Sequence, residues 1–132
     1  MKTLSVKNPW GDLLVRGIKD VENRTWKTSY RGRLLIHAPQ AIDQNYRNMS
    51  LLFTPEQWDS LSVKDQRLMF TGIFTCSAII GEVELVDCVK DSKSVWASPD
   101  SYHWIVKNAV MYKEPILNVK GKLSLWEYNF EK

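Results

Sequence analysis

The chain has 132 residues, of which 18 are Lys or Arg and 15 are Asp or Glu, so its formal net charge is +3 at pH 7. This length suits one domain with a substantial hydrophobic core and makes a second independent domain unexpected. The sequence shows neither the roughly 20 apolar residues of a membrane span nor an apolar N-terminal signal region. We therefore expect a soluble, cytoplasmic protein without a membrane partner.

The first predicted element is a strand over residues 3–7. Leu4 and Val6 alternate with polar neighbours, which is the period of a strand that is buried on one face. Asn8 then has a side-chain oxygen suited to capping a helix, and Pro9 suits the first helical position because it lacks an N–H. The sequence therefore predicts a helix that begins at Pro9.

This helix is predicted to be short and to lead into a second strand. From Trp10 onward, apolar residues recur at helical spacing, and Gly17 is placed to end the helix in the left-handed conformation. Alternation then resumes over residues 20–26, where an extended chain puts Glu22 and Arg24 on one face as neighbours.

These charged neighbours allow two interpretations. In the first, Glu22 and Arg24 form a surface or partly buried ion pair that fixes the strand register and contributes under about 1 kcal/mol when exposed. In the second, Lys19 joins them in a polar pocket that recognises an anionic or hydrogen-bonding ligand. Charged residues on strands are usually solvated, but both interpretations remain open from sequence.

Positive charge is concentrated in the first 33 residues. This part has eight Lys or Arg residues against three acidic ones, a net of +5, whereas the rest has a net of −2. Trp10, Trp26 and Tyr30 lie among these basic residues. Cations interleaved with aromatic rings are typical of a groove for a phosphate backbone and stacked bases. The alternative is a solvated basic surface without a nucleic-acid ligand.

The middle of the chain reads as a strand followed by helices. Residues 33–38 are a mostly apolar run that predicts a buried strand, with His37 near its end as either a hydrogen-bonded core histidine or a site residue. Residues 41–70 predict a helical insertion, with a capped start at Thr54 and a capping box at Ser62. An insertion of this length could cover a cleft.

The last part again has the period of strands. A long strand over residues 76–89 is expected to bend at Gly81, apolar residues continue over 104–111, and residues 122–128 predict a final strand. Strands at both ends with a helical excursion between them predict an α+β fold, a single-domain mixed β-barrel with peripheral helices. Tyr102, Trp104 and Trp126 either fill this barrel or stack on a base.

The sequence contains few residues of the types that commonly bind metals. Cys76 and Cys88 form no CxxC pair, and we expect two reduced thiols. His37 and His103 lie far apart and lack the HExxH spacing. We therefore predict no metal site and no bound cofactor from these residues.

Several segments together resemble the ASCH (activating signal cointegrator homology) family, whose fold is a PUA-like β-barrel. The resemblance extends from the first predicted strand to the last and implies one ASCH domain over residues 1–132. The segments that carry it are Ser5-Val6-Lys7-Asn8-Pro9-Trp10, Gly17-Ile18-Lys19-Asp20-Val21-Glu22-Asn23-Arg24, Tyr30-Arg31-Gly32, Leu35-Ile36-His37-Ala38, Ile80-Gly81-Glu82-Val83 and Gly121 with Leu125-Trp126.

The resemblance implies a link with RNA. ASCH proteins are associated with RNA or transcription, and some bacterial members are hydrolases. One branch removes the acetyl group of 4-acetylcytidine with a lysine and a threonine in the segment that matches residues 17–24. Lys19 matches that lysine, but Glu22 stands where the threonine would be. A carboxylate can activate water but cannot act as a hydroxyl nucleophile.

We expect the site in a cleft beside the first helix, and three functions remain open. The first is binding of RNA or a nucleotide, the second is a hydrolase with Lys19 and Glu22 as catalytic residues, and the third is a protein-interaction module in transcription. A ribonuclease would allow a divalent metal as cofactor. The expected substrate-binding residues are Lys7, Trp10, Arg24, Tyr30, Arg31, Tyr102 and Trp104.

Overall fold

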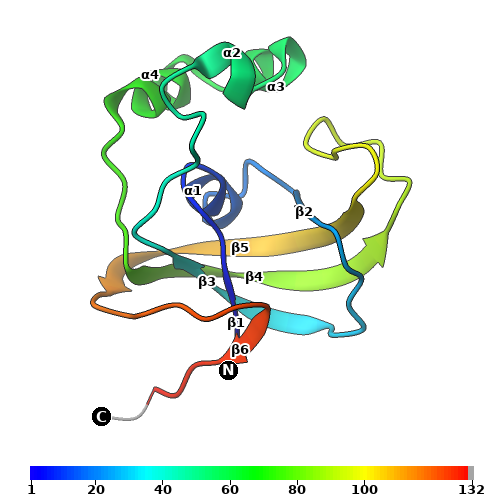
Figure 1. Ribbon diagram of the computed structural model, residues 1–132, viewed down its shortest axis with the longest axis vertical. Coiled ribbons are helices and arrows are strands. Elements are labelled where there is room, and N and C mark those ends of the chain that lie inside the picture. Colours follow the sequence, from blue (N-terminus) through cyan, green and yellow to red (C-terminus); the bar gives the residue numbers. More distant parts are fainter. Residues whose placement is uncertain (131–132) are drawn as a thin grey trace.

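The computed structural model describes residues 1–130 and shows one sheet with helices packed on one side (Figure 1). The strands are β1 (Lys2–Ser5), β2 (Val21–Arg24), β3 (Gly32–Ala38), β4 (Ala78–Val89), β5 (Tyr102–Ile116) and β6 (Leu125–Glu127). The helices are α1 (Trp10–Val15), α2 (Met49–Leu52), α3 (Pro55–Ser60) and α4 (Val63–Thr71). None of the helices within residues 1–130 has the length and apolar character needed to span a lipid bilayer.

The sheet confirms the predicted mixed α+β, PUA-like architecture. Its strand order is β2-β5-β4-β3-β1-β6, with β1 and β3 parallel and the other neighbours antiparallel. The sheet curls around the core as a half-barrel, and the strand order leaves β2 and β6 as its two edges in the described part of the chain. One edge strand, β2, approaches β1, which lies next to the other edge strand, β6. The two face each other across the open side of the half-barrel.

The predicted bend at Gly81 is confirmed. A Cβ atom at this position would lie 2.3 Å from the carbonyl oxygen of Val110 and 2.8 Å from the side chain of Val15. The register of β4 with β5 shifts between Ile79 and Gly81, which marks an irregularity at the same place. The glycine thus lets α1 and β5 approach β4 closely.

Two hydrophobic clusters stabilise the fold. The first lies inside the curl and includes Leu4, Leu34 and Val83, whereas the second lies beneath the helices and includes Leu13, Phe53 and Met69. Helix α1 contributes to both clusters, since Leu14 belongs to the first. The helices over residues 49–71 therefore pack in a second cluster, which also takes in Leu13 of α1 and Val21 of β2.

The start of α1 differs from the prediction by one residue. The helix begins at Trp10, and Pro9 is its N-cap without a side-chain capping bond. The side-chain oxygen of Asn8 instead accepts a hydrogen bond from the N–H of Asp12, one turn into the helix. The end agrees with the prediction, because Gly17 has a φ of 77° and follows the last helical turn.

The caps in the helical segment are as the sequence indicates, with one difference. Thr54 and Gln57 form a complete capping box at α3. Ser62 accepts a bond from the N–H of Asp65 at α4, but the Asp65 carboxylate bonds to the Ser62 hydroxyl instead of its backbone. Asp65 is shorter than the Glu or Gln of a capping box.

The C-terminal strands contain less buried apolar surface than predicted. Val110 and Met111 on β5 are 48% and 46% exposed. The last strand spans Leu125–Glu127 only. Trp126 is largely buried and belongs to the packed interior.

Candidate functional site

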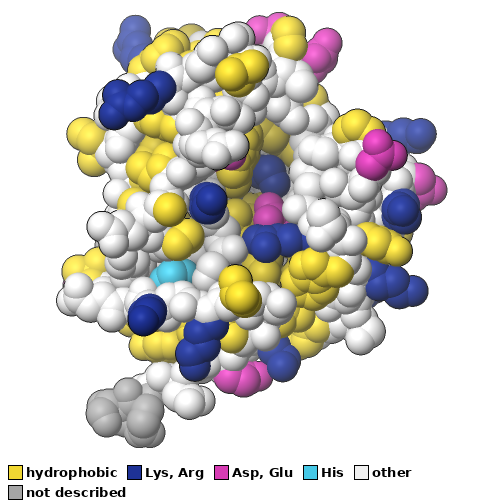
Figure 2. Space-filling view, viewed as in Figure 1, with side chains coloured by type: hydrophobic (Ala, Val, Ile, Leu, Met, Phe, Trp, Pro, Cys, Tyr) yellow, Lys and Arg dark blue, Asp and Glu magenta, His cyan; other side chains and the backbone are white. Residues whose placement is uncertain are grey.

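A cavity of about 570 Å³ lies between α1, β2, the loop after β4 and the segment that runs from α2 to α3. Figure 2 shows a hollow below the helices in which basic and acidic side chains meet among apolar ones. The cavity is close to α1, where the sequence predicts a site. The lining residues are Trp10, Lys19, Glu22, Asn23, Ser50, Leu51, Leu52, Phe53, Thr54, Pro55, Gln57, Trp96 and Ser98.

Three aromatic rings form part of the cavity wall. The ring centroids of Trp10 and Phe53 are 5.2 Å apart, and those of Trp10 and Trp96 are 6.5 Å apart, both with edge-to-face geometry. The Trp10 indole N–H also donates to Asp43 at 2.8 Å, which fixes the orientation of the ring. The wall is therefore rigid and presents π surface beside polar groups.

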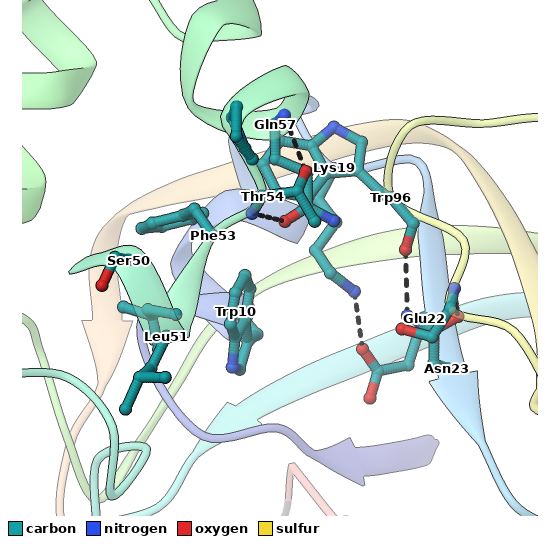
Figure 3. A pocket seen from close by; sticks show the side chains of 13 residues that line it. Trp10, Lys19, Glu22, Asn23, Ser50, Leu51, Phe53, Thr54, Gln57 and Trp96 are labelled. Atoms are coloured by element: carbon teal, nitrogen blue, oxygen red, sulfur yellow. Dashed lines mark hydrogen bonds and ion pairs between the residues drawn. The ribbon is translucent and has the colours of Figure 1, made fainter. Parts of the chain in front are cut away.

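A buried group of charges lies next to these rings. The Lys19 ammonium donates to Glu22 at 3.1 Å, and the Arg24 guanidinium donates through Nε to the other Glu22 oxygen at 2.9 Å. Lys19 and Glu22 are only 4% and 8% exposed. Figure 3 shows Lys19 extending beside Trp10 toward Glu22. One carboxylate with two cations gives the group a net charge of +1, which favours neutral or anionic ligands over cations.

The remaining bonding capacity of these groups matters for a ligand. An ammonium has three N–H donors, and Lys19 uses two of them on the Val21 carbonyl and on Glu22. Each Glu22 oxygen accepts one bond from a cation and has a second lone pair. The cavity can thus offer a donor and an acceptor close together.

Asn23 fastens the loop that holds Trp96. Its side-chain N–H₂ donates to the Trp96 carbonyl, and its oxygen accepts from the Ser98 N–H, both at 2.9 Å. His103 also binds this loop, since its Nε2 bonds to the Ser98 carbonyl at 2.7 Å. Strand β2 therefore supplies the polar floor through Glu22 and positions one aromatic wall through Asn23.

The segment between α2 and α3 forms the opposite wall. Phe53 reaches the cavity from the end of α2, and Thr54 and Gln57 lie at the start of α3 (Figure 3). The capping box and a bond from Gln57 to the Val95 carbonyl hold α3 against the loop after β4. The helical segment thus covers a cleft.

The structure brings together only part of the predicted site. Trp10, Lys19 and Glu22 line the cavity, and Arg24 lies directly behind its floor. Lys7 is exposed just before α1 and is absent from the lining. Glu22 and Arg24 form an ion pair, as the first interpretation expects, and Lys19 joins them at the cavity lining, where the second interpretation expects a polar pocket.

Four predicted binding residues lie elsewhere. Tyr30 packs on the sheet core and donates its hydroxyl to the Arg33 carbonyl, and Arg31 lies on the surface near Asp87. Tyr102 faces the Lys90 ammonium at 4.8 Å. Trp104 is fully buried with its N–H bonded to the Trp26 carbonyl, so it has no surface for a base, and the expectation that it stacks on a ligand is corrected.

Sequence reasoning missed Asn23, Phe53, Gln57 and Trp96. On an extended strand Asn23 faces away from Glu22, and only the folded loop after β4 gives its side chain a partner in the site. Phe53, Gln57 and Trp96 lie outside the basic N-terminal segment. The expected helical cover over a cleft was the one signal that pointed toward Phe53 and Gln57, and no signal pointed toward Trp96.

The contacts of His37 indicate a structural role, and those of Cys76 and Cys88 do not suggest catalytic or metal chemistry. His37 is buried and bonds to Ser5 and to the Val119 carbonyl, as a core histidine does. Cys76 and Cys88 are free thiols. Across residues 1–130, no group of three His, Cys, Asp or Glu side chains is placed to hold a metal ion.

Comparison with known proteins supports the fold described above, and the matched region includes the segments that line the cavity. The model of the ASCH domain family matches residues 4–116. The chain is 32% identical over 139 aligned positions to activating signal cointegrator 1 from Mus musculus and, equally, to that from Homo sapiens. The alignment covers 94% of this chain but only 22% of each relative. The chain therefore belongs to the ASCH domain family.

Proposed function

We propose that this protein binds RNA or a nucleotide and holds a base in the cavity between α1 and the helical segment. The observation that carries the proposal is the pairing of an aromatic wall, Trp10 with Phe53 and Trp96, and a buried polar floor formed by Lys19 and Glu22. Aromatic rings stack on any base, and a donor beside an acceptor can bond to a base edge.

Charge supports the same ligand class. The Lys19–Glu22–Arg24 group carries a net +1, and Lys7 lies exposed beside α1. A phosphate attached to the bound base would therefore meet positive potential. RNA association is general in the ASCH family, to which the chain belongs.

The test is affinity for single-stranded RNA measured over a series of salt concentrations. The logarithm of the affinity should fall linearly with the logarithm of the salt concentration. The double variant Lys19→Ala, Glu22→Ala should lose binding, and wild-type affinity in that folded variant would refute the proposal. Circular dichroism on the same sample establishes that the variant is folded.

A hydrolase is the second candidate, and the 3.1 Å contact between Lys19 and Glu22 inside the cavity favours it. Glu22 would take a proton from water, the water oxygen would attack a carbonyl carbon, and Lys19 would balance the charge on the carbonyl oxygen. With 4-acetylcytidine the bond from the acetyl carbon to N4 would break, the proton held by Glu22 would pass to N4, and acetate and cytidine would leave. A ribonuclease reaction with a divalent metal belongs to the same candidate class.

Incubation with RNA that contains 4-acetylcytidine, with and without divalent metal, separates this candidate from pure binding. Mass spectrometry would report deacetylation or strand scission, and Lys19→Ala is the control. If product forms with the wild type but not with the variant, the protein is a hydrolase. Unchanged RNA alongside salt-dependent affinity leaves the binding function.

A protein-interaction role in transcription is the third candidate. The name of the relatives, activating signal cointegrator 1, and an apolar groove of about 320 Å³ beside Met49, Trp58 and Phe70 favour it. The chain spans about a fifth of those relatives, so their activity as whole proteins applies to it only as a proposal. If the protein neither binds RNA nor turns over RNA or a nucleoside, this role is the one that remains. A cytoplasmic location stays a prediction.

A further inference from the structure

We infer that an RNA strand leaves the cavity across a second basic surface, formed by Lys7, Lys120 and Lys122 and here called the basic rim. The inference rests on the proposed RNA binding and adds a path for the phosphate backbone. All three lysines are exposed. Two of them come from the segment after β5, at the opposite end of the sequence from the basic stretch of the first 33 residues.

The segment after β5 is fixed against the start of the chain. The Val119 N–H donates to the Ser77 carbonyl at 2.8 Å, and the Val119 carbonyl bonds to His37 Nε2 at 2.7 Å. Gly121 then packs so closely that a Cβ atom there would lie 2.6 Å from the His37 ring and 2.7 Å from the Ser5 hydroxyl. Because Lys120 and Lys122 flank this glycine, their backbone is held on the β1 and β3 side of the sheet.

Ser5 connects the basic rim to the cavity. Its carbonyl accepts a bond from Arg24, whose Nε atom bonds to Glu22 in the cavity floor. Its hydroxyl accepts a 3.3 Å bond from the indole of Trp126, and the Lys122 ammonium lies 5.9 Å from the centre of that ring. Contacts thus run without interruption from Glu22 through Arg24 and Ser5 to the Lys122 side of the surface.

The lysines of the basic rim are not paired with acids. Among residues 1–130, no ion pair involves any of them, whereas Lys2 is paired with Glu127 and Arg33 with Glu82. Lys107 and Lys113 on β5 are also exposed and without an ion pair in this part of the chain, so they match the basic rim in charge but not in position. Figure 2 shows basic side chains over β1 and over the segment after β5, on the face where the hollow opens.

The position of the basic rim fits a strand whose base enters the cavity. Exposed lysines on a rigid backbone can neutralise successive phosphates without reading the sequence. Lys120 and Lys122 lie beyond residue 116, where the match to the family model ends. The part of the phosphate path that Lys120 and Lys122 form is therefore assigned from the contacts of this chain alone.

The experiment compares two double variants with the same loss of charge. Lys120→Gln with Lys122→Gln removes part of the basic rim. Lys107→Gln with Lys113→Gln removes two exposed lysines on β5, which is separated from β1 by β4 and β3. Each protein is titrated with a single-stranded RNA of about 12 nucleotides and with a nucleoside monophosphate, at several salt concentrations.

For the RNA, the slope of log affinity against log salt should become shallower by about 1.4 in the Lys120/Lys122 variant, and by clearly less in the β5 control. Affinity for the monophosphate should stay unchanged in both variants, because the cavity is intact. If the wild type binds RNA but the two variants have equal slopes, the basic rim does not bind the phosphate backbone, and the proposed function still stands. Absence of wild-type binding to both ligands would overturn the proposed function itself.

Discussion

Arg24 donates from Nη2 to the carbonyl oxygen of Ser5 at 2.9 Å and so joins the β2 edge of the sheet to β1 across its open side. The same guanidinium bonds to Glu22 through Nε. A single side chain thereby helps to close the curl and to hold the carboxylate of the cavity floor.

Replacement of Arg24 by Gln should therefore reduce stability as well as ligand affinity. The variant loses a charge-assisted bond to Glu22 and a bond to the Ser5 carbonyl, and we expect a loss of roughly 2 kcal/mol in the free energy of unfolding. Urea denaturation measures it. Lys2→Gln, which removes an exposed partner of Glu127, should leave the unfolding free energy nearly unchanged. An equal effect of the two changes would contradict the bridging role of Arg24.

Glu22→Gln should be more severe than the loss of Arg24. The change leaves the Lys19 and Arg24 cations beside a neutral amide in a buried position, and breaking such a group costs about 3–5 kcal/mol. Thermal unfolding should show a lower midpoint, and RNA affinity should fall in the fraction that remains folded. If the Glu22→Gln variant is as stable as the wild type, the buried Lys19 and Arg24 cations do not need the Glu22 charge to remain in place.

Asn23→Ala should loosen the aromatic wall without removing a ring. The variant leaves the Trp96 carbonyl and the Ser98 N–H without their side-chain partner, at a cost of about 1–3 kcal/mol. Affinity for a nucleotide should fall, and tryptophan emission should shift to longer wavelength as Trp96 meets water. Asn129→Ala, at an exposed position, is the matched control. Unaltered affinity and emission would show that the loop keeps its place without Asn23.

Stability should fall with pH below neutrality because of His37. Burial lowers the pKa of this imidazole and outweighs the bond to the Val119 carbonyl, which raises it. The unfolded chain then binds a proton near the ordinary value of 6.5 while the folded protein does not. The unfolding free energy should be highest above that pH and should decrease as pH falls toward the lower folded pKa, by at most about 1.4 kcal/mol per pH unit.

Proton NMR of the two histidines checks this assignment directly. The His37 ring signals should titrate below pH 6.5 in the folded protein. Urea midpoints at pH 7.5 and pH 5.5 give the change in stability. Titration of His37 at or above its ordinary pKa would contradict the stated cause.

Gly81→Ala should disrupt the packing of α1 on the sheet. The new methyl group would lie 2.3 Å from a backbone oxygen, so strands or helix must shift, and we expect a loss of at least about 3 kcal/mol. Gly17→Ala is the control, because its new Cβ would only make an ordinary contact at 3.7 Å from the Ala109 side chain, and the left-handed backbone costs about 1–2 kcal/mol. Denaturant titration ranks the two. A smaller loss at Gly81 than at Gly17 would show that β4 adapts at little cost.

The sequence was most informative where local pattern decides the outcome. Alternation predicted β1, and an apolar run predicted β3. Turn chemistry placed Gly17 after α1, and an isolated glycine in a long strand pattern marked the irregular part of β4. These features depend on neighbours within a few residues. The helix starts one residue later than predicted, with Pro9 as its N-cap, and Asn8 bonds to the N–H of Asp12 from the position before the cap.

Tertiary contacts decided what the sequence could not. Lys19 and Glu22 meet within one short segment, and the sequence placed them together correctly. Trp96 reaches the same cavity from more than seventy residues away, held by Asn23, and no periodicity carries that information. Trp104 shows the reverse error, since an aromatic residue on a strand can point into the core or toward a ligand, and only the packed sheet decides.

The separation of the two hydrophobic clusters has a consequence for how this domain can diversify. The cluster under the helices supports Phe53 and, through Val21, the floor strand β2, whereas the cluster inside the curl holds β1, β3 and β4 together. Exchange of the 49–71 segment for another of similar length that still packs on Val21 would remodel one wall and spare the cluster inside the curl. Such a chimera would keep the same charged floor while accepting ligands of a different shape.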